Sequence, residues 1–228
     1  MLKLESVSKK FGGVQAVSNC SFEVKKGTIT ALIGPNGAGK STVFNLILGV
    51  QNPESGKVFF KNTDIAKFPI FKRARMGISR TFQMVRVFKN LTVQDNLRLA
   101  TENQDDIQRM ISLLGLEAKL DTLNADLSFG QLKILSLARA LLLPHELLML
   151  DEPVAGVNPV LREKFKNIFR RLKEKGETIF LIEHDMDFVM DIADHVIVMD
   201  AGQVLTQGSP SEILNNPKVL EAYLGEQI

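Results

Sequence analysis

Residues 34–42 read GPNGAGKST and lie between the compact apolar run TITALI (28–33) and the segment VFNLIL (43–48). The first run is typical of a buried strand, and the apolar spacing of the second, which stops at Gly49, is typical of a helix. A glycine-rich turn between a strand and a helix fits the pattern G-x-x-x-x-G-K-[ST] in the context that it requires. Its glycines allow successive backbone N–H groups to converge on phosphate oxygens. This stretch therefore predicts a phosphate-binding loop.

The side chains of this loop suggest how a nucleoside triphosphate would be held. Lys40 can place its charge on the β- and γ-phosphates, and the Ser41 hydroxyl can ligate Mg²⁺. The residues expected to contact the nucleotide here are Gly34, Pro35, Asn36, Gly37, Ala38, Gly39, Lys40, Ser41 and Thr42.

A second strand ends in two carboxylates. Residues 147–153 read LLMLDEP, and continuous apolar runs of this kind are typical of buried parallel strands, whose carboxyl ends gather ligands. Asp151 could hold Mg²⁺, and Glu152 could accept a proton from an attacking water. The alternative, a solvent-facing acidic turn, is disfavoured by the phosphate loop in the same chain. No NKxD motif is present, which argues against a GTPase switch.

The order of predicted elements indicates an α/β fold. Strand-like and helical segments alternate from residue 146 onward, which favours βαβ units and a mostly parallel sheet, whereas the alternating patterns near the N-terminus favour antiparallel strands. Residues 84 to about 127 have helical, polar-faced patterns without strand-like runs. We predict an ATP-binding α/β core formed by residues 1–82 and 146–228, with residues 83–145 as an inserted helical subdomain.

Composition excludes several classes of protein. The 228 residues carry a net charge of +2, and the short basic segment FKRAR (71–75) is expected to be a solvated helix face, so no nucleic-acid partner is predicted. Cys20 is the only cysteine, which fits a reducing compartment. No signal peptide or uncharged apolar run of about 18 residues is found. We therefore expect a cytoplasmic chain.

The segments GPNGAGKS, LSFGQ (127–131) and LLMLDEP, in that order, resemble the ATP-binding subunit of ABC transporters over essentially the whole length. The resemblance implies that LSFGQ is the signature motif, which reaches the ATP held by the phosphate loop of a second subunit. Ser128, Gly130 and Gln131 would then contact that nucleotide. A serine at a helix start can meet a phosphate in this way; the alternative is a plain helix cap. Two Mg-ATP molecules would be sandwiched between two chains.

The resemblance also assigns roles to isolated residues. Gln83 in RTFQ matches the glutamine that links the nucleotide and its metal to the helical subdomain. His184 in LIEHDM matches the switch histidine, which contacts the γ-phosphate, and Phe11 in KKFGG matches the aromatic that stacks on adenine. Departures from the family pattern are Phe129, where a glycine is usual, Asn158, where many relatives carry Asp, and a short helical subdomain.

Several motifs (RTFQ, EPVAGVNP, IEHDM and EAYLGE) resemble those of ATPases from importers for branched-chain amino acids. The implied partners are an identical or homologous ATPase, transmembrane permease subunits and, indirectly, a solute-binding protein. The implied location is the cytoplasmic face of the membrane. Urea, amides or an exported cargo remain alternatives, because these motifs belong to the ATPase. So does a soluble nucleotide-dependent regulatory module.

Overall fold

The computed structural model describes residues 1–81, 88 and 90–224, and its strands form two sheets. The smaller sheet is antiparallel, in the order β2-β1-β4-β5. Its strands are β1 (Leu2–Phe11), β2 (Val14–Val24), β4 (Ser55–Phe60) and β5 (Thr63–Asp64). The antiparallel N-terminal portion predicted from the alternating sequence is therefore confirmed.

The larger sheet has the order β10-β9-β3-β8-β7-β6. All neighbours in it are parallel except β9 and β10, which pair antiparallel. Its strands are β3 (Ile29–Ile33), β6 (Ile78–Arg80), β7 (Leu147–Asp151), β8 (Ile179–Ile182), β9 (His195–Asp200) and β10 (Gln203–Gly208). Both β3 and β7 are buried along their whole length, as their continuous apolar runs predict.

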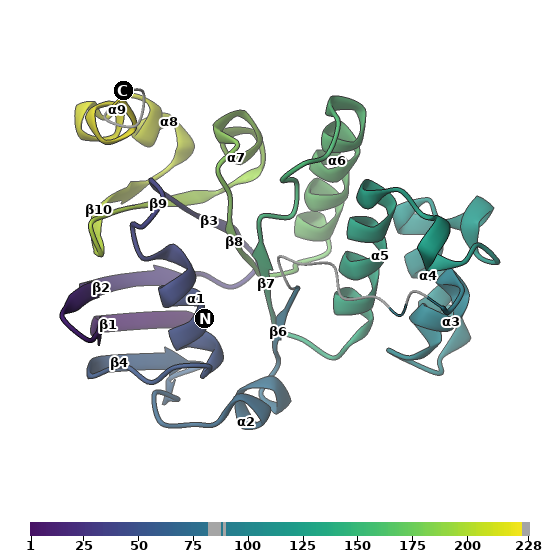
Figure 1. The fold of residues 1–228 in the computed structure, drawn as a ribbon, viewed down its shortest axis with the longest axis horizontal. Helices are drawn as coiled ribbons and strands as arrows, with labels where there is room; N and C mark the ends of the chain where they lie inside the picture. The colour runs from purple at the N-terminus through teal and green to yellow at the C-terminus, as the bar shows by residue number, and fades with distance from the viewer. Residues whose placement is uncertain (82–87, 89, 225–228) are drawn as a thin grey trace.

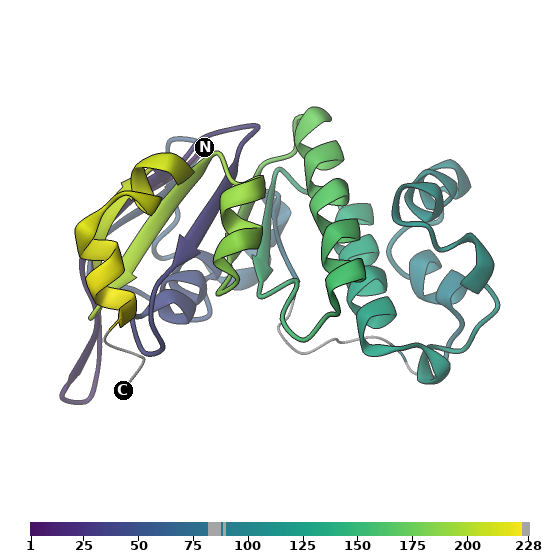
Figure 2. The same ribbon diagram turned by 90° about the horizontal axis from the view of Figure 1, so that it is seen from above.

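Helices surround the larger sheet and extend from one side of it. They are α1 (Lys40–Leu48), α2 (Ile70–Arg75), α3 (Val93–Arg98), α4 (Gln104–Leu114), α5 (Phe129–Leu142), α6 (Pro159–Glu174), α7 (Met186–Ile192), α8 (Pro210–Leu214) and α9 (Pro217–Leu224). Figures 1 and 2 place α3 and α4 at the end of the molecule opposite the yellow C-terminal helices, beyond α5 and α6. Among the described residues, no helix has both the length and the apolar character required to cross a membrane.

The larger sheet is covered on both faces, which is why its central strands are apolar at successive positions. On β7, Leu148 and Leu150 face a core shared with α3 to α7. Leu147 and Met149 face a second core, formed with α1 and the antiparallel sheet. The sheet is therefore held from two sides, and this fixes the carboxyl ends of β3, β7 and β8 relative to one another.

The structure corrects the sequence interpretation at one basic segment. Arg73, within the segment expected to be a solvated helix face, is 1% exposed, whereas Arg75 on the same helix is exposed. Arg73 donates through Nη1 to the carbonyls of Leu46 and Ile47, at 2.5 and 2.8 Å. It thereby caps the C-terminal end of α1. A sequence pattern could not reveal this contact, because the acceptors lie 26 and 27 residues away in the chain.

Candidate functional site

The phosphate loop connects the buried end of β3 to the first turn of α1. Gly34 and Gly39 have φ angles of +147° and +97°. A Cβ atom at Gly34 would lie 2.1 Å from the Met199 carbonyl oxygen, and one at Gly39 would lie 2.4 Å from that of Ala16. Glycine is required at both positions because the backbone conformation and the space exclude a side chain. The predicted loop geometry follows from these two constraints.

Lys40 is the first residue of α1 and is only 6% exposed. Its Nζ atom donates hydrogen bonds to the carbonyl oxygens of Gly34 and Pro35, at 2.6 and 2.7 Å. The ammonium group is thus held over its own loop, beside the positive end of the α1 dipole. This arrangement favours an anion at the helix start.

Next to the loop lies a cleft of about 340 Å³. Its lining consists of Ala16, Asn36, Gly37, Ala38, Gly39, Lys40, Ser41, Thr42, Glu152, Ile182 and His184. Residues from the loop, from the end of β7 and from the segment after β8 therefore converge, although they are distant in sequence. The cleft lies at the carboxyl ends of parallel strands, where ligands of α/β sheets bind.

Glu152 and His184 form a pair on one wall of the cleft. The His184 Nε2 atom lies 3.1 Å from the Glu152 Oε1 atom, and the side chains are 40% and 22% exposed. Glu152 has a φ angle of +48°, a conformation that non-glycine residues seldom adopt. Strain of this kind gathers at functional sites. The pair could hold and deprotonate a water molecule near a phosphate.

Asp151 ends β7 and is buried beside Arg80. The Arg80 Nη2 atom donates to Asp151 Oδ2 at 2.8 Å. Burial raises the pKa of Asp151, while Arg80 opposes that rise. The Ser41 hydroxyl and the Asp151 carboxylate are oxygen donors of the kind that Mg²⁺ takes alongside phosphates and water, so the residues present fit this ion. Sequence reasoning missed Arg80. The one feature of the sequence that could have pointed to it is its position three residues before Gln83 in the motif RTFQ.

The LSFGQ segment begins α5 and lies outside the described lining of the cleft. Ser128 and Gln131 form a capping box: the Gln131 amide donates to Ser128 Oγ at 3.3 Å, and the Ser128 amide donates to Gln131 Oε1 at 2.9 Å. A Cβ atom at Gly130 would lie 2.0 Å from the Leu161 Cδ2 atom, so this glycine allows α5 to pack against α6. Ser128 and the Phe129 ring are exposed. The structure thus does not bring these residues to the chain's own phosphate loop.

The remaining predicted site residues occupy separate positions. Phe11 is 43% exposed at the end of β1, and the Lys9 Nζ atom lies 5.4 Å from its ring centroid. Gln83 lies outside the described residues. Asn158 caps α6, because its Oδ1 atom accepts from the Leu161 amide at 2.8 Å. The departure from Asp at this position therefore preserves a helix cap.

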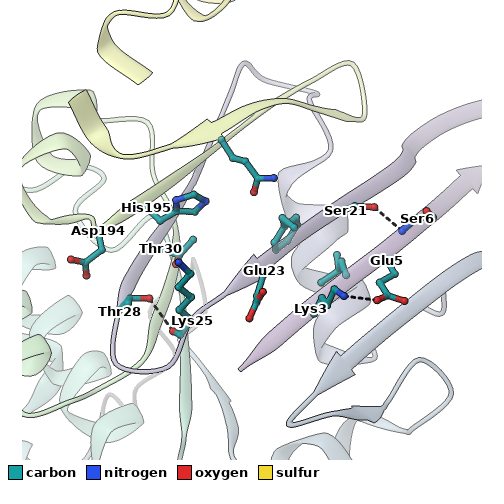
Figure 3. A pocket seen from close by; sticks show the side chains of 13 residues that line it. Lys3, Glu5, Ser6, Ser21, Glu23, Lys25, Thr28, Thr30, Asp194 and His195 are labelled. Carbon is teal, nitrogen blue, oxygen red and sulfur yellow. Dashed lines mark hydrogen bonds and ion pairs between the residues drawn. The ribbon is translucent and has the colours of Figure 1, made fainter. Parts of the chain in front are cut away.

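A larger cavity, of about 720 Å³, lies between the two sheets and is drawn in Figure 3. Thr28 and Thr30, at the beginning of β3, and His195, at the beginning of β9, line it. These are the amino ends of parallel strands, opposite to the edge that carries the phosphate loop. The cavity is therefore not part of the phosphate site.

This combination of fold and cleft agrees with known proteins. Residues 17–155 match the family model described as ABC transporter. The chain belongs to the ABC transporter family. Residues 203–228 also match the model of the branched-chain amino acid ATP-binding cassette transporter.

The cassette is similar to curated proteins over nearly the full length of both chains. It is 39% identical to a probable branched-chain amino acid transport ATP-binding protein of Archaeoglobus fulgidus, covering 100% of the chain and 96% of that protein. It is 37% identical to the high-affinity branched-chain amino acid transport ATP-binding protein of Salmonella typhimurium, covering 99% and 98%.

Solved structures agree with the fold. The ADP conformation of an ATP-binding cassette of an ABC transporter has a TM-score of 0.90 at 34% identity, covering 99% of this chain and 98% of that one. A dimeric cassette in a post-hydrolysis state, bound to ADP and Pi, has a TM-score of 0.80 at 23% identity, covering 92% and 99%. The predicted fold class and family are thus confirmed.

Proposed function

We propose that this cassette is the ATP-hydrolysing subunit of an importer for branched-chain amino acids. One observation carries the hydrolysis: a single cleft joins the phosphate loop to the Glu152–His184 pair. The match of residues 203–228 to the branched-chain cassette model supports the cargo, as do the two relatives over nearly their full length.

In the proposed reaction, the phosphate loop and Lys40 bind the triphosphate, and Glu152 accepts the proton of an attacking water. His184, paired with Glu152, contacts the γ-phosphate and positions that water. Ser41, Asp151 and Gln83 would hold Mg²⁺, which would neutralise phosphate charge when bound. Phosphoryl transfer depends mainly on positioning and on stabilisation of charge, which these residues can supply.

The position of LSFGQ supports a dimer of cassettes. Ser128 lies at an exposed helix start outside the chain's own cleft, so its hydroxyl and the α5 N-terminus are available to the nucleotide of a second cassette. A structure with the same fold is itself a dimer bound to ADP and Pi, which is consistent with a dimer of cassettes. Ser128, Gly130 and Gln131 of one chain would then complete the site of the other, with Phe11 against the adenine. The partner cassette is identical or homologous.

A groove of about 890 Å³ supports a permease as the membrane partner. It runs between α2, β6 and the segment that follows α5, and it exposes the apolar side chains of Val50, Ile70 and Leu143. Arg80 lines it too, so the groove adjoins the strand that leads towards Gln83. We infer that a permease segment docks here, which places the cassette at the cytoplasmic face of the membrane. A solute-binding protein would act through that permease.

The packing of the helices supports the division of the chain predicted above. We infer that residues 83–145 are a helical subdomain inserted between the core segments 1–82 and 146–228. Its helix α5 packs against both α3 and α4. The first residues of this subdomain lie outside the described residues.

The test of hydrolysis is the Glu152→Gln variant. We expect it to lose ATP turnover by at least about 100-fold, as removal of a general base does, and to retain ATP-dependent dimers in size-exclusion chromatography. Glu102→Gln, at an exposed site, is the matched control and should hydrolyse ATP normally. Normal hydrolysis by Glu152→Gln would refute the assigned base.

The cargo is tested separately by uptake of radiolabelled leucine, urea and acetamide in a strain that lacks this chain. Loss of leucine uptake alone, restored by the wild-type chain but not by Glu152→Gln, is the expected result. Unchanged leucine uptake would refute the cargo while leaving the ATPase assignment intact.

A further inference from the structure

Glu152 is held in its unusual conformation by hydrogen bonds to both its backbone N–H and its backbone carbonyl. Its amide donates to the Ile182 carbonyl oxygen at 2.9 Å. Its own carbonyl oxygen accepts from the Lys133 Nζ atom at 2.8 Å. A residue with φ of +48° persists only where its surroundings determine it, so these contacts keep the side chain directed into the cleft.

Lys133 lies on α5, two residues after the end of the LSFGQ segment, and is 8% exposed. Its Nζ atom donates to the carbonyl oxygens of both Glu152 and Ala155, at 2.8 and 2.6 Å. It also lies 5.3 Å from the centroid of the Phe129 ring. Burial of an ammonium group is costly and is seldom found unless the charge is paired. Here the charge is compensated by two carbonyl dipoles, an aromatic face and the nearby carboxylates of Glu183 and Glu152.

Glu183 also binds the loop that follows Glu152. It is 2% exposed, and its Oε1 atom accepts from the Val154 amide at 2.8 Å. Its Oε2 atom accepts from the His184 amide at 3.1 Å. One buried carboxylate therefore joins the loop after Glu152 to the backbone of the histidine that pairs with Glu152. The function proposed above assigns no role to Glu183 or Lys133.

We propose that Lys133 and Glu183 are positioning residues that together set the backbone of Glu152 for hydrolysis. Because Lys133 belongs to the helix that begins at Ser128, it also connects the residues that contact the partner's nucleotide with the residue that hydrolyses the chain's own. That helix start serves the partner's nucleotide, and Glu152 serves the chain's own. This inference rests on the proposed function. Contact between Ser128 and the neighbouring nucleotide would be transmitted along one turn of α5 to the carbonyl of Glu152.

The main test compares Lys133→Met with wild type in steady-state ATP hydrolysis. Loss of the bonds to the two carbonyls should lower kcat by about 100-fold, the usual effect of a misplaced catalytic group, with KM for ATP changed less than about 3-fold. Lys133→Arg, which retains the charge and the donors, should recover at least a tenth of the wild-type kcat. Lys164→Met is the matched control, because Lys164 also donates to a backbone carbonyl, that of Gly115, from the adjacent helix α6.

Glu183→Gln provides a second and independent variant of nearly equal volume. In the glutamine, an NH2 group replaces one of the two oxygens that accept from the Val154 and His184 amides, and a donor cannot accept from an amide. The kcat should therefore fall again without a change in KM. Binding of a fluorescent ATP analogue to each variant verifies that the chain is folded. Wild-type kcat in both Lys133→Met and Glu183→Gln would overturn the proposal, as would an equal loss in Lys164→Met. Absence of hydrolysis by the wild-type chain itself would refute the proposed function instead.

Discussion

Replacement of Arg73 by methionine should destabilise the cassette without affecting the chemistry of its cleft. Four hydrogen bonds hold the guanidinium group. The Nε atom donates to the Phe68 carbonyl oxygen at 2.8 Å, and the Nη2 atom donates to that of Ala66 at 2.9 Å. The Nη1 atom donates to the carbonyls of Leu46 and Ile47 at the end of α1. Methionine fills much of the volume but satisfies none of the four oxygens.

The net loss of stability in Arg73→Met is the energy of the lost hydrogen bonds minus the cost of burying the charge that is removed. Four hydrogen bonds from a charged donor, at about 1.5 kcal/mol each, amount to about 6 kcal/mol. Against this, burial lowers the pKa of Arg73 to about 10, with Asp64 opposing the change, and removal of the buried charge recovers about 3 kcal/mol. We therefore expect the free energy of unfolding to fall by about 3 kcal/mol. For a chain of this length, Tm should fall by about 6–12 °C.

The assay is urea unfolding at neutral pH, followed by circular dichroism, with Arg75→Met as the control. Arg75 is exposed on the same helix, so its replacement should cost less than about 1 kcal/mol. At temperatures where Arg73→Met remains folded, kcat should equal that of wild type, because the contact lies at the end of α1 remote from the cleft. Equal stability of Arg73→Met and wild type, or equal losses at both positions, would refute the reasoning.

Gly39→Ala should weaken ATP binding and cost about 1–3 kcal/mol of stability because of the φ angle and the Ala16 carbonyl. Gly37→Ala, whose Cβ atom would meet nothing within 4 Å, should cost less in thermal unfolding; equal losses would contradict this account. Burial lowers the pKa of His145, but bonds to Glu177 and to a backbone carbonyl outweigh it, so the folded pKa is raised. The stabilisation is therefore complete below the unfolded pKa of about 6.5 and is lost as pH rises through the folded pKa. His145→Gln should accordingly be less stable than wild type by up to about 1 kcal/mol at pH about 5.5, and a pH-independent difference would exclude the ion pair.

The sequence predicts those parts of the site whose chemistry is local. The glycine spacing of residues 34–42 determines where backbone amides can converge, and the charged end of the apolar run 147–152 places two carboxylates at a strand terminus. Burial of β3 and β7 on both faces follows from their uninterrupted apolar residues. The N-cap role of Ser128 is also local, because serine bonds an amide three residues away.

The sequence was less informative for short elements with weak patterns and for charged residues whose partners lie far away in the chain. The strand β10 and the short strand β6 carry weak patterns and were not predicted, and the helix expected at residues 71–75 was predicted as fully solvated. Arg80, Lys133 and Glu183 were passed over, although all three lie beside predicted site residues. Each becomes meaningful only through a partner from another segment, such as Asp151 for Arg80.

The chain's sequence by itself determined the phosphate loop and the acidic strand end, because each depends on residues close together in the chain. It also determined the α/β class, because each strand and helix has its own local pattern and their order is read directly along the chain. Only the tertiary structure decided which cations are buried. Arg73 and Arg75 have the same side chain and lie on the same helix, yet one is enclosed by carbonyls of α1 and of the segment after β5, and the other faces solvent. The free energy of a buried charge is governed by the oxygens that surround it, and packing between remote segments places those oxygens.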